Sequence, residues 1–376
     1  MARKTRFVIR AAALASFLCV LSHIFAVFRP QQRQQVSFEA FSSSSSSLVL
    51  QNTKRFSNAE WHSRTDQTQE IRIVTTVCGG RTAESLAMMK SALIMSRPST
   101  FIRFIVLADN KSIVFLTEAI RLWPDNILNR MSLDLRPISF PGDGHDDWKA
   151  LFKLCSAERL FLPSLLKEVD SVLYMDVDTV FLSSPLHVWQ HLGKMSETQM
   201  VALAPDEQDY ADGWYPASAN HPYHGKFGVN AGVMLMNLTK MRHFGWEKYV
   251  VRLFEQYKHR IMWGDQDLIN IFFHFHPEKL YVYPCNYNYL AHHCSKTSLC
   301  KEAEQQGIYV LHGNTEAFLN DRLPALKAIY TSIKQHSFSD NLQTLLANMK
   351  DSLIKTGHTS NCGKVMNSLP KLLMDT

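Results

Sequence analysis

Short runs of apolar and β-branched residues, separated by helical patterns, constrain the fold of this chain more than any other feature. The runs occupy residues 71–78, 101–108, 171–176, 200–204, 232–237 and 307–312. Their length and composition are typical of strands buried on both faces of a sheet. The segments 83–96 and 149–161 have the periodicity of helices. Because strands alternate with helices, we expect an α/β domain, a mostly parallel sheet flanked by helices, over about 70–330.

A further amphipathic pattern predicts a helix that closes the domain. Apolar residues in this segment are spaced as one helical face: Leu342, Leu345, Leu346, Met349 and Leu353. Ser339 or Asp340 is the expected N-cap. The chain is 46% hydrophobic, which is enough for a packed core. We therefore assign 70–376 to one globular domain.

The first 69 residues predict a membrane anchor and a flexible stem. Residues 11–28 contain no Asp, Glu, Lys or Arg, and 18 apolar residues are about the minimum that crosses a bilayer. Four cations within 1–10 predict a cytosolic tail and a luminal domain, as in single-pass type II proteins. A cleaved signal peptide is the alternative, but no small residues follow the span. The polar, serine-rich segment 29–69 is an expected disordered stem.

Charge and cysteine content narrow the possible partners and compartment. The net charge is +6, of which the first ten residues supply +4. Because the chain has no other basic run, nucleic acid is not an expected partner.

Six cysteines follow the predicted span: Cys78, Cys155, Cys285, Cys294, Cys300 and Cys362. An even number suits disulfides in an oxidising lumen, with fifteen possible connectivities. A zinc site using His292 and His293 is the alternative, although its spacing is not standard.

One buried run leads into two closely spaced aspartates, Asp176 and Asp178, with Val177 between them. Alternate residues of a strand share a face, so both carboxylates can point toward the carboxyl edge of the sheet. Two adjacent carboxylates repel each other unless a cation neutralises them, and oxygen ligands suit Mn²⁺ or Mg²⁺. The motif therefore predicts a metal and diphosphate site; a turn with an Asx cap is the structural alternative.

Three other motifs add to this interpretation. Small residues surround Asn230 just before an apolar run, where backbone can approach a ligand closely. Asp265 and Gln266 begin an apolar helix, where a carboxylate can also act as a cap. His312 ends a strand and can complete a metal shell. Aromatic residues near these motifs can stack on a sugar or pack in the core: Trp214, Tyr215, Tyr223, Trp263, Tyr287 and Tyr289.

These motifs, in this order, resemble glycosyltransferase family 8, whose members are retaining enzymes with the Rossmann-like GT-A fold. The resemblance rests on VLYMDVDTVFL, VNAGVMLMN, GDQDLIN and VLHGN and covers about residues 70–365. The longer stretches 214–242, 262–289 and 307–314 resemble the animal glucoside xylosyltransferases. The resemblance implies a type II enzyme of the Golgi or endoplasmic reticulum membrane. Its implied reaction is transfer of xylose from UDP-xylose, in α1,3 linkage, to O-linked glucose on EGF-like repeats such as those of Notch.

The resemblance also implies roles for individual residues. Asp176, Asp178 and His312 would bind Mn²⁺ or Mg²⁺. The expected donor-binding residues are Thr75, Thr76, Cys78, Lys153, Val177, Asn230, Ala231, Gly232 and Gly313. A lysine that family members commonly carry after the His-Gly pair is absent, which leaves Arg322 as a candidate.

The expected catalytic residues are Gln266 and Asp265. In a same-face route, Gln266 would stabilise the oxocarbenium ion, whereas in a double displacement Asp265 would be the nucleophile. We favour the same-face route. The amide of Gln266 cannot act as a nucleophile, and the carboxylate of Asp265 can instead serve as a helix cap. Two other functions stay open: a family 8 hexosyltransferase that uses UDP-glucose or UDP-galactose, and a non-catalytic membrane-anchored glycan-binding protein.

Overall fold

The computed structural model describes residues 48–50, 69–140, 148, 155–207, 213–296, 298–356 and 360–366. The predicted tail and membrane span, nearly all of the predicted stem, and Lys153 lie outside these residues. Within the described residues, no helix has both the length and the apolar character needed to cross a membrane.

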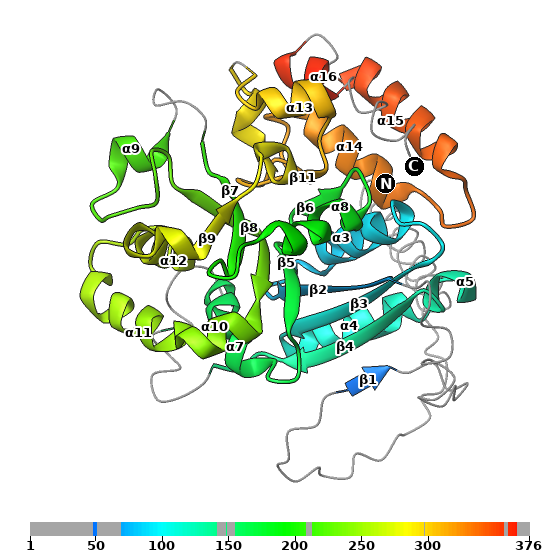
Figure 1. Ribbon diagram of the computed structural model, residues 1–376. Helices are drawn as coiled ribbons and strands as arrows, with labels where there is room; N and C mark the ends of the chain where they lie inside the picture. The colour runs from blue at the N-terminus through cyan, green and yellow to red at the C-terminus, as the bar shows by residue number, and fades with distance from the viewer. Residues whose placement is uncertain are drawn as a thin grey trace, which may run out of the picture. The chain divides into compact units, whose positions relative to one another are not determined.

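An eight-stranded sheet runs through the described part of the chain (Figure 1). In spatial order its strands are β1 (Leu48–Leu50), β4 (Met131–Pro137), β3 (Thr100–Ala108), β2 (Gln69–Val77), β5 (Ser171–Met175), β8 (Val229–Asn237), β7 (Val201–Pro205) and β9 (Leu280–Val282). Strands β4, β3, β2 and β5 are mutually parallel, which confirms the expected α/β architecture. Strand β8 is antiparallel to both of its neighbours.

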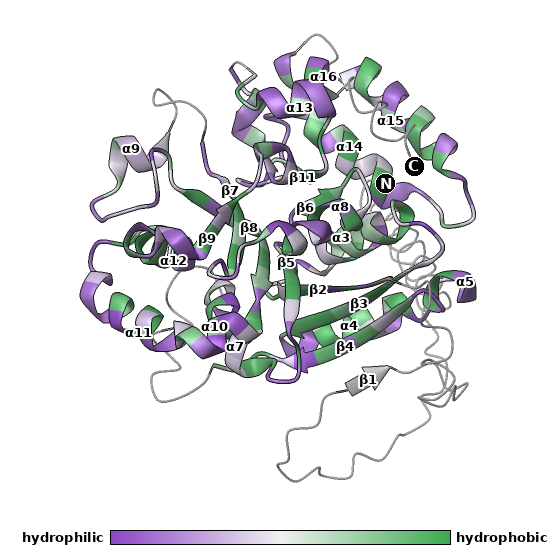
Figure 2. Cartoon of the chain, viewed as in Figure 1, coloured by the Kyte–Doolittle hydropathy of each residue, from purple (hydrophilic) through white to green (hydrophobic). Residues whose placement is uncertain are grey.

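Two layers of helices cover the two faces of this sheet. Along β5, Leu173 and Met175 join one apolar cluster, whereas Val172 and Tyr174 join the other. The first cluster includes side chains from α3 (Thr82–Ile94), α4 (Asn110–Ile120), α14 (Pro324–Gln335) and α15 (Leu342–Thr356). The second includes side chains from α10 (Leu238–Phe244), α11 (Trp246–Tyr257) and α12 (Asp265–Phe275). Hydrophobic residues concentrate on the central strands (Figure 2).

The remaining helices are short. They are α5 (Asp125–Leu128), α7 (Leu162–Leu165), α8 (Pro185–Trp189), α9 (Trp214–Ser218), α13 (Lys301–Gln306) and α16 (Asn361–Met366). The described part of the helix expected over 149–161 is a 3₁₀ segment, Ser156–Phe161.

The predicted closing helix is α15. Its N-cap is Asn341, whose side-chain oxygen accepts the Thr344 N–H at 2.9 Å. The expectation of Ser339 or Asp340 was wrong by one or two residues.

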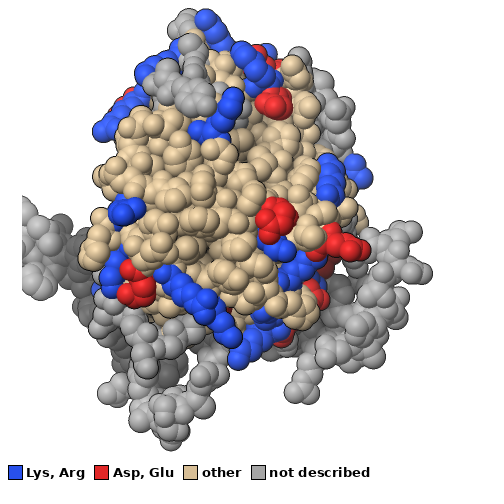
Figure 3. Space-filling view, turned by 60° about the vertical axis from the view of Figure 1, so that its left-hand side comes forward, with Lys and Arg blue, Asp and Glu red and all other residues tan. Residues whose placement is uncertain are grey.

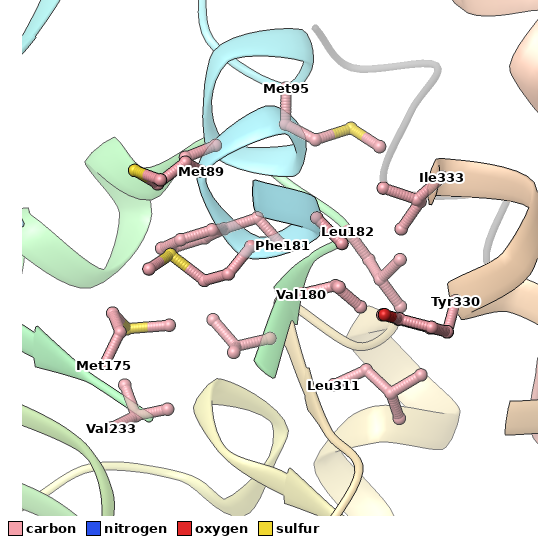
Figure 4. Packing of buried hydrophobic residues seen from close by; sticks show 14 of the residues in the cluster. Met89, Met95, Met175, Val180, Phe181, Leu182, Val233, Leu311, Tyr330 and Ile333 are labelled. Carbon is pink, nitrogen blue, oxygen red and sulfur yellow. The ribbon is translucent and has the colours of Figure 1, made fainter. Parts of the chain in front are cut away.

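A second, three-stranded sheet brings distant segments together beside β5. It contains β10 (Tyr289–Leu290), β11 (Val310–His312) and β6 (Thr179–Phe181). Strand β11 is antiparallel to β6, and His312 lies opposite Thr179 in that pairing. Side chains of β6 and β11 pack with those of α3 and α14; in Figure 4, Phe181 lies near Met89, and Leu311 lies near Tyr330. This packing places the end of β11 beside the turn that contains Asp178.

The predicted disulfides form in three pairs. Cys78 bonds Cys155, Cys285 bonds Cys300, and Cys294 bonds Cys362. The three cysteines that a zinc site near His292 and His293 would need are therefore all in disulfides. This pairing removes the zinc alternative.

Candidate functional site

Two carboxylates and an imidazole converge at the end of β5. Asp176, Asp178 and His312 offer ligand atoms that all lie within 4.8 Å of one another. His312 Nε2 is 3.5 Å from Asp178 Oδ1 and 3.9 Å from Asp176 Oδ2. Backbone hydrogen bonds fix the turn, since the Asp176 N–H donates to Gly232 O and the Gly313 N–H donates to Asp178 O. The structure thus brings together the three residues that the sequence analysis assigned to a metal.

A second layer of contacts orients the imidazole of His312. Its Nδ1 lies 3.0 Å from Asn288 Oδ1, and the Asn288 amide donates to Asn230 Oδ1 at 2.9 Å. Nε2 is therefore left to face the carboxylates. A Cβ on Gly232 would lie 2.1 Å from His312 Cε1, so only glycine leaves room for the ring. Carboxylate oxygens with one oriented imidazole form a donor set that fits Mn²⁺.

Asp178 is held in its ionised form. Burial raises its pKa, but the hydrogen bond and charge of His312, together with the charge of Arg81, hold the pKa well below its usual range. Arg81 Nη2 is 3.3 Å from Asp178 Oδ2. The site therefore presents a carboxylate rather than a carboxylic acid at neutral pH.

Arg159 connects the metal-binding turn to the candidate catalytic residues. Its guanidinium binds Asp176 Oδ1 and Asp265 Oδ2 at 2.7 Å each, and the Ala231 carbonyl oxygen at 2.6 Å. It also lies over the Tyr174 ring, 4.4 Å from the centroid. Arg159 was not among the residues predicted for the site. Lys153, the predicted donor-binding residue of the same segment, lies outside the described residues, so its role stays a prediction.

Asp265 and Gln266 begin α12, as predicted, but Asp265 is not a cap. The N-cap is Gly264, without a side-chain hydrogen bond, and Asp265 instead pairs with Arg159. Burial raises the pKa of Asp265 to about 6, with Arg159 opposing and Asp176 adding to the rise. Gln266 Oε1 accepts the Ala231 N–H at 3.3 Å, and Gln266 Nε2 donates to Asp206 Oδ1 at 3.4 Å.

A cleft of about 560 Å³ opens over these residues. Predicted site residues that line it are Thr76, Cys78, Asp176, Val177, Asp178, Asn230, Asp265, Gln266 and His312. Thr75, Ala231, Gly232 and Gly313 are not among the residues that line it. Lining residues that the sequence analysis missed are Arg81, Ser156, Arg159, Tyr174, Asp206, Glu207, Asn314, Thr315 and Glu316. Arg322 is exposed and does not line the cleft.

One part of the cleft combines aromatic rings with acidic groups. Trp214 and Trp263 line it, whereas Tyr215, Tyr287 and Tyr289 are buried in the core. His292 Nε2 is 2.9 Å from Glu207 Oε1 and 3.0 Å from the Asp206 carbonyl oxygen. Burial lowers the pKa of His292, but its contact with Glu207 and Asp206 gives a net rise.

Residues other than Lys, Arg, Asp and Glu fill the middle of the face shown in Figure 3. Lys and Arg side chains lie at the top of this face, at its sides and across its lower part.

Comparison with known proteins identifies the family. The model of glycosyl transferase family 8 matches residues 153–317. The chain is 41% identical over 307 residues to glucoside xylosyltransferase 2 of Xenopus laevis, covering 78% of this chain and 72% of that protein. It is 40% identical over 318 residues to glucoside xylosyltransferase 1 of Homo sapiens, covering 81% and 71%.

Solved structures share the fold. The galactosyltransferase LgtC, in complex with donor and acceptor sugar analogs, superposes with a TM-score of 0.54 at 19% identity, over 73% of this chain and 98% of that one. The WbbM bifunctional glycosyltransferase gives 0.52 at 15% identity, over 74% and 51%. This likeness confirms the GT-A type of α/β fold. The chain belongs to glycosyl transferase family 8 and is a UDP-sugar-dependent glycosyltransferase.

Proposed function

We propose that this enzyme transfers xylose from UDP-xylose, with retention and in α1,3 linkage, to O-linked glucose on EGF-like repeats. The observation that carries the proposal is the 41% identity to a glucoside xylosyltransferase over most of both chains. The cleft supports it, because acidic, amide and aromatic groups surround the residues expected to bind a nucleotide sugar. The EGF-like carrier comes from the sequence resemblance.

In this proposal the donor extends along the cleft from the end of β2 to the start of α12. Thr76 and Cys78 bind the nucleoside with the Val177 backbone, and Thr75 supports this strand end. Asn230 binds the sugar. Ala231 and Gly232 support the sugar site through their backbone, which bonds Gln266, Arg159, Asn230 and Asp176. Lys153 lies outside the described residues, and Gly313 supports the site through its hydrogen bond to the Asp178 carbonyl.

Asp176, Asp178 and His312 would hold Mn²⁺, or Mg²⁺, against the diphosphate. When bound, the cation supplies charge neutralisation for the leaving diphosphate. The protein contributes the ionised Asp178, the ring orientation set by Asn288, and the space left by Gly232.

The contacts of Asp265 favour a same-face reaction over double displacement. Its Oδ2 binds the Arg159 guanidinium at 2.7 Å, and an oxygen engaged in a charge-assisted hydrogen bond is a weaker nucleophile. In our proposal Gln266 places its amide beside the donor sugar and stabilises the oxocarbenium charge. The leaving diphosphate then accepts the proton of the acceptor hydroxyl.

We place the enzyme in the Golgi or endoplasmic reticulum membrane as a single-pass type II protein. The three disulfides suit an oxidising lumen. The proposed anchor, 11–28, lies outside the described residues.

The direct test uses the full-length protein in detergent with an O-glucosylated EGF-like repeat. UDP-xylose, UDP-glucose and UDP-galactose are supplied separately, with Mn²⁺ or with a chelator, and the product mass is measured. We expect a pentose to be added only from UDP-xylose and only with the metal. Linkage analysis should give α1,3.

Each alternative predicts a different product. A hexose increment would replace the proposal with a hexosyltransferase. Retention of the repeat without any mass change, from any donor, would favour a glycan-binding protein. The unglucosylated repeat is the control and should stay unmodified.

A further inference from the structure

We propose that Trp263, Trp214, Glu207 and His292 form the subsite that binds the acceptor glucose as a neutral pyranose ring. The proposal rests on the glycosyltransferase function above and assigns a part of the cleft that the donor does not use. It makes these four side chains determinants of acceptor specificity.

The four residues lie beside the expected position of the donor sugar. All four line the same cleft as Asp178. His292 bonds the Asp206 backbone, and the Asp206 side chain accepts from Asn230 at 3.0 Å and from Gln266 at 3.4 Å. A ligand that contacts Glu207 and His292 would therefore lie next to Gln266. An acceptor hydroxyl must occupy such a position to reach the sugar that is transferred.

Trp263 presents part of its aromatic surface to the cleft. Its side chain is 39% exposed, although it belongs to a cleft rich in polar groups. Trp214 supports it in an edge-to-face contact, with ring centroids 5.7 Å apart. Sites that bind small molecules are typically lined by aromatic side chains together with a few oriented polar groups. The flat apolar face of a pyranose ring is a suitable partner for an indole of this kind.

The backbone under Trp263 is fixed. Asp267 Oδ2 accepts the N–H groups of Met262 and Trp263 at 2.7 Å each. Asp267 Oδ1 accepts the hydroxyl of buried Tyr215 at 3.0 Å. The indole is therefore mounted on a rigid turn, which lowers the entropy lost when a ligand binds.

The Glu207–His292 pair supplies oriented polar groups. The Glu207 side chain is 5% exposed and lines the cleft, and His292 Nε2 holds its Oε1 at 2.9 Å. A carboxylate fixed in this way accepts hydrogen bonds from hydroxyl groups in a defined direction. Aromatic surface together with acceptors for hydroxyl protons is the chemistry that recognises a sugar ring.

The charges in this part of the cleft disfavour an anionic ligand. Asp206, Glu207 and Asp265 are acidic. The His292 imidazole is already paired with Glu207, and the Arg159 guanidinium already binds Asp176, Asp265 and the Ala231 carbonyl. A phosphate or an acidic peptide placed here would face carboxylates without a new cation. A neutral hydroxylated ring meets no such repulsion.

The first test separates acceptor binding from donor chemistry. Trp263→Ala and Glu207→Gln are compared with wild type for transfer to the O-glucosylated repeat and for slow hydrolysis of UDP-xylose without acceptor. We expect KM for the acceptor to rise at least about tenfold, as for the loss of one interface anchor. UDP-xylose hydrolysis and the Kd for UDP should stay within about twofold. Trp263→Phe should restore most of the acceptor affinity.

Met262→Ala is the matched control, because Met262 is the neighbouring residue, is 64% exposed and does not line the cleft. It should leave both activities unchanged. An unchanged acceptor KM in Trp263→Ala and Glu207→Gln, or an equal loss of transfer and hydrolysis, would overturn the subsite.

A second measurement does not depend on turnover. Saturation-transfer NMR of methyl glucoside with the wild-type protein and UDP should show contact to the ring protons, and Trp263→Ala should abolish it. No transfer to the ring protons in wild type, or equal transfer in wild type and Trp263→Ala, would contradict the inference. Failure of wild-type transfer together with sugar contact would reject the proposed reaction but keep the subsite.

Discussion

At the scale of single residues, the candidate metal site depends on a glycine as much as on its ligands. Gly232 lies inside β8 rather than at its first residue, where the apolar run predicted over 232–237 placed it, because β8 begins at Val229, which pairs with Pro205 of β7. The missing side chain at 232 is what allows His312 to approach Asp176 and Asp178.

Gly232→Ala should therefore act as a substitution of the metal site. The added Cβ would lie 2.1 Å from the His312 ring, so the ring must move and Mn²⁺ affinity should fall about 10- to 100-fold. Calorimetry with Mn²⁺ and UDP measures this. Gly193→Ala is the control, since a Cβ at Gly193 meets nothing within 4 Å; equal metal affinity in both variants would contradict the explanation.

Arg159→Lys tests whether the guanidinium of Arg159 is needed at the site. Three separate guanidinium nitrogens bind Asp176, Asp265 and the Ala231 carbonyl, and an ammonium cannot reproduce that fork. We expect kcat with UDP-xylose to fall at least about 100-fold and stability to fall by about 1–3 kcal/mol. Steady-state kinetics measures kcat, and urea unfolding measures the free energy of unfolding.

The exposed Arg322→Lys is the control and should change neither quantity. Wild-type kcat in Arg159→Lys would show that the fork is dispensable.

At the scale of elements, a covalent link ties the end of β2 to the segment that carries Arg159. Cys78 follows β2 and Cys155 immediately precedes the 3₁₀ segment Ser156–Phe161. Cys78 also lines the cleft, so the link and the site share a residue.

Removing this disulfide should therefore affect both stability and nucleotide binding. The double variant Cys78→Ser, Cys155→Ser removes a cross-link between residues 77 apart in sequence. The free energy of unfolding should fall by about 4.5 kcal/mol, and UDP binding should weaken. The pair Cys285→Ser and Cys300→Ser is the control, with a separation of 15, for which we expect about 3 kcal/mol and unchanged UDP binding. Unfolding curves and UDP titrations distinguish them; equal effects on UDP binding would count against a link to the site.

The sequence predicted the elements with long, clear periodicity. The six apolar runs became strands, and the patterns before 96 and after 340 became α3 and α15. Strand β4 was missed because Asp134 and Arg136 interrupt its apolar pattern, although Asp134 is buried against Arg103 and Arg136. The antiparallel direction of β8 depends on packing across the sheet, which no local pattern encodes.

The candidate site was predicted where a motif marks it. Asp176, Asp178 and His312 stand in recognisable runs, whereas Arg159, Asp206 and His292 gain their roles only from tertiary neighbours. Asp206 follows β7, and His292 lies in a 3₁₀ turn after β10. Neither segment has a spacing that distinguishes a site residue from an ordinary polar one.

At the scale of the whole molecule, the buried histidine His293 makes stability depend on pH. Burial, with the charge of His292 adding, lowers the pKa of His293 to about 3. Its Nδ1 accepts the Leu290 N–H at 3.2 Å, so the ring is neutral in the fold. Below pH 6.5 the unfolded chain protonates this histidine and the folded chain does not, so stability falls as pH falls.

His293→Gln should therefore reduce the acid sensitivity of the protein. Between about pH 6 and 4 one fewer proton is taken up on unfolding, which lowers the slope of stability against pH by about 1.4 kcal/mol per pH unit. Urea unfolding at several pH values measures the slope. His259→Gln, at an exposed position, is the control and should keep the wild-type slope, and a wild-type slope in His293→Gln would contradict the assignment.

The central claim is that Asp176, Asp178 and His312 bind one divalent cation that is needed for UDP-sugar transfer. The most direct measurement is a Mn²⁺ titration in the presence of UDP, by electron paramagnetic resonance, of wild type, Asp178→Asn and the exposed control Asp321→Asn. We predict one bound Mn²⁺ in wild type and control, and an affinity at least about 10- to 100-fold lower in Asp178→Asn. Equal Mn²⁺ affinity and stoichiometry in all three proteins would contradict the claim.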